Sequence, residues 1–95
     1  MTFLLSPQFK KDVNKLPKSV RKRVRKALYR LRDEERGEIK KVEDDLWRLR
    51  VGDYRVYYYP KNNDTYVLRV LHRRHVYRRE TIKALLKRIN RLEEQ

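Results

Sequence analysis

The chain has 95 residues, 39% of them hydrophobic, and a formal net charge of +14. Repulsion among so many positive charges disfavours the compact state, so we expect a polyanionic partner that relieves it. The candidates are nucleic acid, an anionic membrane surface and an acidic protein. The absence of cysteine excludes disulfides and thiolate metal sites, and two histidines do not suffice for a zinc site, so we expect no metal and no cofactor. The length predicts a single domain, residues 1–95. With no leader and no long apolar run, we expect a cytoplasmic protein without a membrane partner.

The first half of the chain predicts a strand followed by two helices. Thr2–Leu5 is a short apolar run that suits an opening strand. Ser6 and Pro7 have the residue types of a helix N-cap and a first helical position. Pro17 separates this short helix from a second one, which has an apolar stripe and an otherwise mostly basic surface. Residues 38–45 are interpreted as an acidic link into the sheet.

The second half predicts an antiparallel meander and a final helix. The strands are expected over Leu46–Val51, Tyr54–Tyr59 and Thr65–Arg73, separated by turn-forming residues. An amphipathic stripe, which either packs on the core or covers a groove for a partner helix, predicts the C-terminal helix: Ile82, Leu85, Leu86, Ile89 and Leu92. The order β-α-α-β-β-β-α is an α+β fold, a small antiparallel β-sheet with an N-terminal helical hairpin on one face and a C-terminal helix. The opposite face is expected to stay open.

The alternation of side chains along the strands predicts two different sheet faces. The core-facing set is apolar: Trp47, Leu49, Val51, Tyr54, Val56, Tyr58, Leu68 and Val70. The opposite set is basic and aromatic: Arg48, Arg50, Arg55, Tyr57, Tyr59, Arg69 and Arg73. An ordinary solvated face is one interpretation. We favour an anionic ligand, because like charges across strands are destabilising and because arginine binds phosphate bidentately and stacks on bases.

Two segments carry a resemblance to a known family. LWRLRVGDYRVYY, from residue 46, and VLRVLHRRHVYR, from residue 67, resemble the RelE/ParE toxin superfamily, and the helical segment SPQFKKDVNKLPKSVRKRVRKAL is similar to its helical hairpin. The resemblance implies a RelE-like fold and the toxin half of a type II toxin–antitoxin pair, neutralised by a small, often acidic antitoxin. For the RelE branch it implies an endoribonuclease that cleaves mRNA on the ribosome and inhibits translation. The ParE branch shares the fold but poisons DNA gyrase.

The resemblance to the RelE branch also implies catalytic positions. The basic residue that this branch has on its second strand falls on Arg48, and the arginines of its third and fourth strands fall on Arg55 and Arg73. The tyrosine near its C-terminus falls on Tyr77. ParE toxins tend to lose several of these positions, which favours the RNase interpretation. Leu46 and Arg48 stand where some members offer a lysine, so an acid/base lysine is missing from that strand.

The chemistry of metal-free RNA cleavage assigns roles to these side chains. The 2′-hydroxyl is the nucleophile, so the enzyme must move protons and stabilise the phosphorane charge. Arginine stays protonated, so Arg55 and Arg73 are predicted phosphate clamps. Tyr77 or His75 is the predicted proton-transfer group, whereas His72 is expected to point toward the core. The remaining predicted RNA contacts are Arg50, Tyr57, Arg69 and Arg74.

Three functions remain open from the sequence. The favoured one is a metal-independent endoribonuclease toxin, with mRNA, the ribosome and a cognate antitoxin as partners. The second is a gyrase poison of the ParE kind. The third is a non-catalytic RNA-binding domain that uses stacking tyrosines and arginines.

Overall fold

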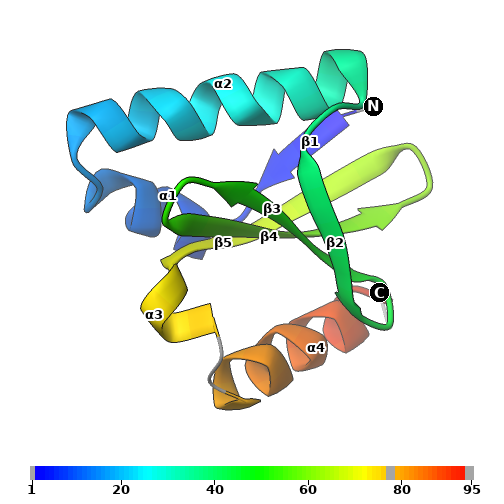
Figure 1. Ribbon diagram of the computed structural model, residues 1–95. Coiled ribbons are helices and arrows are strands. Elements are labelled where there is room, and N and C mark those ends of the chain that lie inside the picture. Colours follow the sequence, from blue (N-terminus) through cyan, green and yellow to red (C-terminus); the bar gives the residue numbers. More distant parts are fainter. Residues whose placement is uncertain (1, 77–78, 94–95) are drawn as a thin grey trace.

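The computed structural model describes residues 2–76 and 79–93. Its elements are β1 (Thr2–Leu5), α1 (Pro7–Asn14), α2 (Lys18–Glu34), β2 (Glu38–Glu43), β3 (Leu46–Val51), β4 (Tyr54–Lys61), β5 (Asp64–His72), α3 (Arg73–Val76) and α4 (Arg79–Glu93). The five strands form one sheet in the order β1-β5-β4-β3-β2 (Figure 1). The predicted α+β class, with an N-terminal helical hairpin and a C-terminal helix, is confirmed. Within the described part of the chain, no helix combines the length and apolar character needed to cross a membrane.

Local sequence signals explain how the helical hairpin begins. The Ser6 hydroxyl accepts a hydrogen bond from the backbone N–H of Phe9 at 3.0 Å, and Pro7 occupies the first turn, as the sequence predicts. The same hydroxyl donates to the backbone carbonyl of Leu68 at 2.8 Å. This N-cap therefore also attaches the start of α1 to β5.

Two edge strands differ from the prediction. β1 pairs with β5 in parallel, so the sheet is mixed and only β2–β5 form an antiparallel meander. Residues 38–43, expected as a link, form β2 and pair with β3. Most side chains of β2 are exposed, so it lacks the alternation of apolar and polar residues that marks a half-buried strand. Its charged residues are typical of a protected sheet edge.

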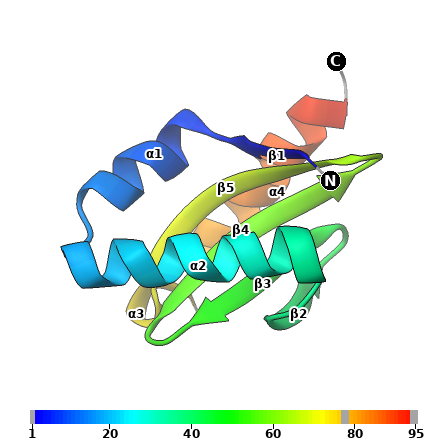
Figure 2. The same ribbon diagram turned by 90° about the horizontal axis from the view of Figure 1, so that it is seen from above.

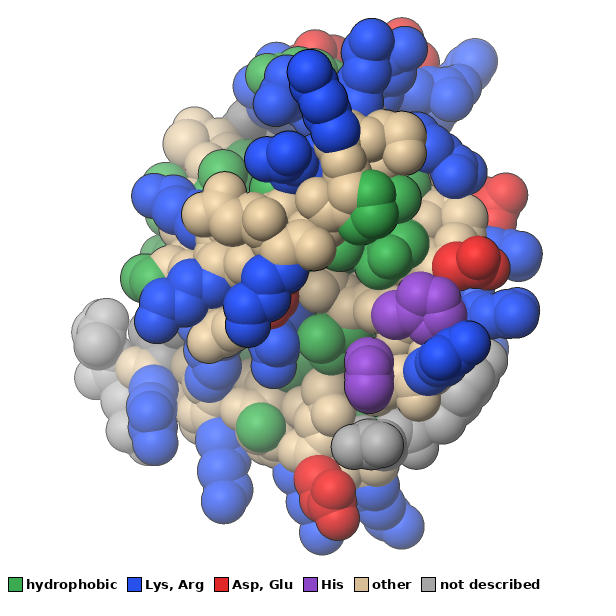
Figure 3. All heavy atoms as spheres, turned by 90° about the vertical axis from the view of Figure 1, so that its left-hand side faces the viewer, with side chains coloured by type: hydrophobic (Ala, Val, Ile, Leu, Met, Phe, Trp, Pro, Cys, Tyr) green, Lys and Arg blue, Asp and Glu red, His purple; other side chains and the backbone are tan. Residues whose placement is uncertain are grey.

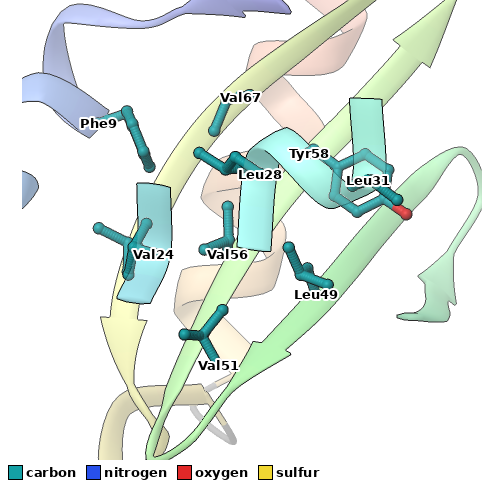
Figure 4. Close-up of a cluster of buried hydrophobic side chains, with 10 residues drawn as sticks. Phe9, Val24, Leu28, Leu31, Leu49, Val51, Val56, Tyr58 and Val67 are labelled. Atoms are coloured by element: carbon teal, nitrogen blue, oxygen red, sulfur yellow. The ribbon is translucent and has the colours of Figure 1, made fainter. Parts of the chain in front are cut away.

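Helices cover both faces of the sheet, which gives three layers (Figures 1 and 2). One core lies between the sheet and the α1–α2 hairpin (Figure 4): Phe9, Val24, Leu28, Leu31, Leu49, Val51, Val56, Tyr58, Val67 and Val70. A second core lies against α4: Leu46, Tyr57, Tyr59, Leu68, Leu85 and Ile89. The prediction that the arginine-bearing face stays open is therefore wrong.

The apolar stripe of α4 explains why this helix docks. Leu85 and Ile89 are buried, and Ile82 and Leu86 pack against the same cluster, while the side chain of Leu92 lies outside the described residues. Burying a leucine or isoleucine side chain contributes about 1.5–3 kcal/mol. The stripe thus stabilises α4 on the sheet, in agreement with the first of the two interpretations of it.

A bulge in β5 moves one predicted core residue to the other face. Tyr57 lies opposite Arg69 and Tyr58 lies opposite Val67, so Leu68 is the extra residue. Leu68 belongs to the core beneath α4, and Val67 takes the place expected for it in the first core. The prediction for Leu68 is wrong because the strict period of two is interrupted at this position.

Candidate nucleic-acid interface

The strand register places three predicted site residues on the sheet face that carries α4. Arg48 lies opposite Tyr57, and Arg50 lies opposite Arg55. Tyr57 belongs to the core beneath α4, and side chains alternate between faces along each strand. Arg48, Arg50 and Arg55 therefore share this face, as the sequence predicts.

Tyr57 is covered, contrary to its predicted role. It has no exposed surface, and Tyr59 is only 2% exposed, because both side chains lie in the core beneath α4. A tyrosine must present its ring face to stack on a base. With α4 in this position, the predictions of Tyr57 as an RNA contact and of Tyr59 as part of an open face are wrong.

Arg69 is engaged by a carboxylate within the fold. Its Nε and Nη2 donate to the two oxygens of Asp12 at 3.0 Å each, and the N–H of Val70 donates to Asp12 at 3.2 Å. Gln8 donates to the same carboxylate at 3.2 Å. This buried carboxylate joins α1 to β5, so the prediction of Arg69 as an RNA contact is replaced by a structural role. The sequence signal was a lone acidic residue beside the apolar stripe of a basic helix.

The β3–β4 turn collects arginines from three elements. Gly52 has a left-handed φ of 59°, and Arg55 donates from NH1 to the carbonyls of Gly52 at 2.9 Å and Tyr54 at 3.0 Å. Arg23 of α2 lies against the same turn, since a Cβ at Gly52 would be 2.8 Å from its NH2. Arg55 is only 8% exposed, so its guanidinium has a fixed orientation. Arg23 was not predicted as a site residue, because its helix face looks merely solvated in the sequence.

Arg73 reaches the same turn from the end of β5. Its backbone N–H donates to the carbonyl of Asp53 at 2.7 Å, and its Nε lies 3.7 Å from Asp53 Oδ1. Both side chains are more than 60% exposed, so this ion pair contributes about 0–1 kcal/mol. An incoming phosphate can therefore replace Asp53 on Arg73. Arg55 and Arg73 are held by neighbouring residues of one turn, although Arg55 lies on β4 and Arg73, predicted as the last residue of a strand, is the first residue of α3.

Of the two histidines and Tyr77 that were considered near the site, the structure describes only the histidines. His72 packs edge-on against Tyr54, with ring centroids 5.2 Å apart, and its Nδ1 accepts from the N–H of Arg74 at 3.2 Å. Tyr54 borders the first core, in agreement with the predicted direction of His72. His75 and Arg74 are exposed on α3, and Figure 3 shows both histidines on one side of the molecule with several basic side chains. Tyr77 lies outside the described residues.

A lysine that was not predicted adjoins Arg48. Lys40 of β2 lies directly opposite it, on the same sheet face, and is exposed. No clear sequence signal marks Lys40, because residues 38–43 lack the alternation of a half-buried strand and were interpreted as a link. β3, which has no lysine, thus has a lysine beside it on β2.

The arrangement provides cationic groups rather than a metal site. Among the residues that the structure describes, no group of three His, Cys, Asp or Glu side chains is placed to hold a metal ion. Arginines clustered around one turn can instead bind a phosphate and neutralise charge that develops on it.

Comparisons with known proteins agree with this geometry. The family model described as ParE toxin of type II toxin–antitoxin system, parDE, matches residues 3–77. The chain belongs to this toxin family. It is therefore a toxin of the RelE/ParE superfamily from type II toxin–antitoxin systems, as the resemblance in the strands and the helical hairpin predicts. A sequence search of curated proteins gave no match.

Solved RelE-type structures share the fold of this toxin. It is similar to a chain of the RelB–RelE antitoxin–toxin complex from Methanococcus jannaschii, with 28% identity, TM-score 0.68, and coverage of 78% of this chain and 94% of that one. A chain of the archaeal RelE–RelB complex from Pyrococcus horikoshii OT3 has 28% identity and TM-score 0.63, over 76% and 93% of the two chains. The isolated RelE toxin of E. coli, at 21% identity and TM-score 0.63 over 93% and 97%, shows the likeness of fold alone.

Proposed function

We propose that this toxin is a metal-independent endoribonuclease that cleaves mRNA, on the ribosome, and so inhibits translation. The observation that carries the proposal is the meeting of Arg55 and Arg73 at the β3–β4 turn, beside Arg48 and Arg50. The 28% identity to two archaeal RelE-type chains supports the RNase branch of the superfamily.

Arg48, Arg55 and Arg73 each have a part in the proposed reaction. In the proposed step the 2′-hydroxyl attacks the adjacent phosphorus, the bond to the 5′-oxygen of the next nucleotide breaks, and a 2′,3′-cyclic phosphate and a 5′-hydroxyl result. Arg55, oriented by the turn carbonyls, is preorganised to stabilise the phosphorane. Arg73 and Arg48 bind the phosphate and orient the RNA. Tyr77 or His75 transfers the proton, because arginine remains protonated.

The test is cleavage of a defined mRNA by the purified toxin, with and without ribosomes and with excess EDTA. We expect cleavage in EDTA, with a 5′-hydroxyl on the downstream fragment and a cyclic or 3′-phosphate on the upstream fragment. Cleavage that EDTA abolishes, or a 5′-phosphate on the product, would contradict the mechanism. The ribosome-free reaction shows whether the ribosome is required.

A gyrase poison is the second candidate, because the matching family model is that of ParE toxins. The two candidates differ in the damage that follows expression of the toxin. Transcript cleavage without double-strand DNA breaks supports the RNase, and DNA breaks with intact transcripts support the gyrase poison. The burial of Tyr57 and Tyr59 removes the stacking side chains on which a non-catalytic RNA-binding role depended.

The proposal includes a cognate antitoxin as the toxin's partner. The RelE chains to which this toxin is similar were solved in complex with RelB antitoxins. The net charge of +14 favours an acidic partner that covers basic surface or displaces α4. We also infer that residues 1–95 act as one toxin domain in the cytoplasm. Co-expression with a small acidic protein encoded by an adjacent gene should restore growth, and continued toxicity with that protein present and folded would contradict this partner.

A further inference from the structure

Four basic side chains adjoin one another on the face of the sheet that carries α4. This basic corner consists of Lys40 on β2, Arg48 and Arg50 on β3, and Arg55 on β4. Lys40 lies directly opposite Arg48, and Arg50 lies directly opposite Arg55. Side chains paired in this way have Cβ atoms about 4.5–5.5 Å apart, and like charges at that spacing are destabilising.

The fold offsets little of this repulsion. Glu38 lies 3.6 Å from Arg50, but both side chains are more than half exposed, so the ion pair is weak. Arg55 is oriented by backbone carbonyls of its own turn. An anionic ligand would relieve both like-charge pairs at once. Two such pairs side by side are therefore evidence for a bound polyanion rather than for a solvated surface.

The other half of the same sheet face is closed to RNA. Tyr57, opposite Arg48 on the inner side, is buried beneath α4, and Arg69 beyond it is bound by Asp12. Figure 1 shows α4 running below the sheet from α3 toward the turn between β2 and β3. An RNA strand on this face is therefore restricted to the parts of β3 and β2 that α4 leaves exposed, which include Arg50 and Lys40.

We propose that Lys40 binds an RNA phosphate next to the one that Arg48 contacts, so that the bound RNA extends from the β3–β4 turn toward β2. The identity of the ligand as RNA rests on the proposed function. Lysine suits this place, since its ammonium has three rotatable donors and a long flexible stem. Lys40 is exposed and has no competing carboxylate directly opposite it. This extends the predicted RNA contacts to a strand outside the predicted site.

The next residue of the chain offers a matched control. Lys41 is exposed and on the same strand, but it lies opposite Trp47, whose side chain packs against the first core. The strand register shifts directly after Lys41, and Lys41 lines a hollow with Leu86, Ile89 and Asn90 of α4, so it borders α4 rather than Arg48. Substitution of either lysine by glutamine removes the same charge from the same edge strand. Only the substitution of Lys40 should remove a phosphate contact.

The experiment measures binding without cleavage. The probe is a single-stranded RNA whose 2′-hydroxyls carry methyl groups, which removes the nucleophile, and its affinity is measured from 50 to 300 mM salt. For Lys40→Gln we expect the slope of log affinity against log salt to fall in magnitude by about 0.7, the value for one phosphate contact with a single strand. We expect the wild-type slope for Lys41→Gln and for Lys40→Arg. Circular dichroism verifies that each variant is folded.

The outcomes separate this inference from the proposed function. An unchanged slope for Lys40→Gln, or equal losses for both glutamine variants, overturns the inference. The inference is also overturned if Lys40→Gln keeps the wild-type slope of log RNA affinity against log salt but binds the acidic polypeptide poly-glutamate less tightly. Lys40 then belongs to a protein-docking surface. Cleavage is measured separately on unmodified RNA. A wild-type toxin that binds RNA with the expected Lys40 dependence but cleaves nothing refutes the nuclease and leaves the RNA contact of Lys40 supported.

Discussion

Replacing Asp12 by alanine should destabilise the toxin strongly, although no residue of the basic corner changes. Asp12 is 7% exposed, and its carboxylate accepts hydrogen bonds from Nε and Nη2 of Arg69, from the N–H of Val70 and from Gln8. Removing one partner of a buried ion pair costs about 3–5 kcal/mol, because the other charge is left buried and uncompensated. The Arg69 side chain is 30% exposed, so water can reach it and the lower end of that range applies.

The assay is thermal and urea-induced unfolding followed by circular dichroism. A loss of about 3 kcal/mol should lower the melting temperature by roughly 12–24 °C, since 1 kcal/mol corresponds to about 4–8 °C in a domain of this size. Asp12→Asn keeps an acceptor for Val70 but loses the charge, so we expect an intermediate loss. The matched control is Asp33→Ala. Asp33 bonds Arg32 at 2.8 Å, but both side chains are well exposed, so its removal should change the melting temperature little.

The same series tests whether Arg69 is structural. Arg69→Met keeps much of the apolar stem and removes the charge, and combined with Asp12→Ala it should recover part of the lost stability, because the uncompensated charge is gone. A loss below 1 kcal/mol for Asp12→Ala would refute the reasoning. So would additive effects of the two substitutions, since residues that share an interaction must be coupled.

Three further predictions concern the reaction and the core. Arg73→Ala should slow RNA cleavage by about 10²–10³-fold through lost charge stabilisation. Arg30→Ala removes an exposed arginine of α2 that has no assigned role in the site, so it should retain activity within a few-fold, and equal losses for the two variants would contradict a specific role of Arg73. Tyr77→Phe should slow cleavage by about 10²-fold or more if the phenol transfers the proton, and a larger loss for His75→Ala would assign the proton to the imidazole. Burial raises the pKa of Tyr58 to about 12. The stability that this phenol contributes is therefore present below about pH 10 and is lost as the pH rises toward 12, and Tyr58→Phe should show a smaller loss of melting temperature over that interval.

Local patterns in the sequence were sufficient for much of the fold. The N-cap at Ser6, the β3–β4 turn at Gly52 and the alternation in β3 and β4 depend on residues that are neighbours in the chain. They predicted the helical hairpin and the face shared by Arg48, Arg50 and Arg55. These side chains were assigned correctly because side-chain direction in an uninterrupted strand follows from position alone.

The tertiary structure decided which of the basic side chains remain exposed. The bulge at Leu68, the pairing of β2 and the docking of α4 over Tyr57 depend on contacts between distant parts of the chain, which no local pattern reports. Asp12 and Arg69 are 57 residues apart in sequence, and their ion pair turns a predicted RNA contact into a structural one. Lys40 lies beside Arg48 through a pairing that local patterns do not report either. An edge strand needs no apolar alternation of its own, because one of its sides is solvated and its position is set by the strand with which it pairs.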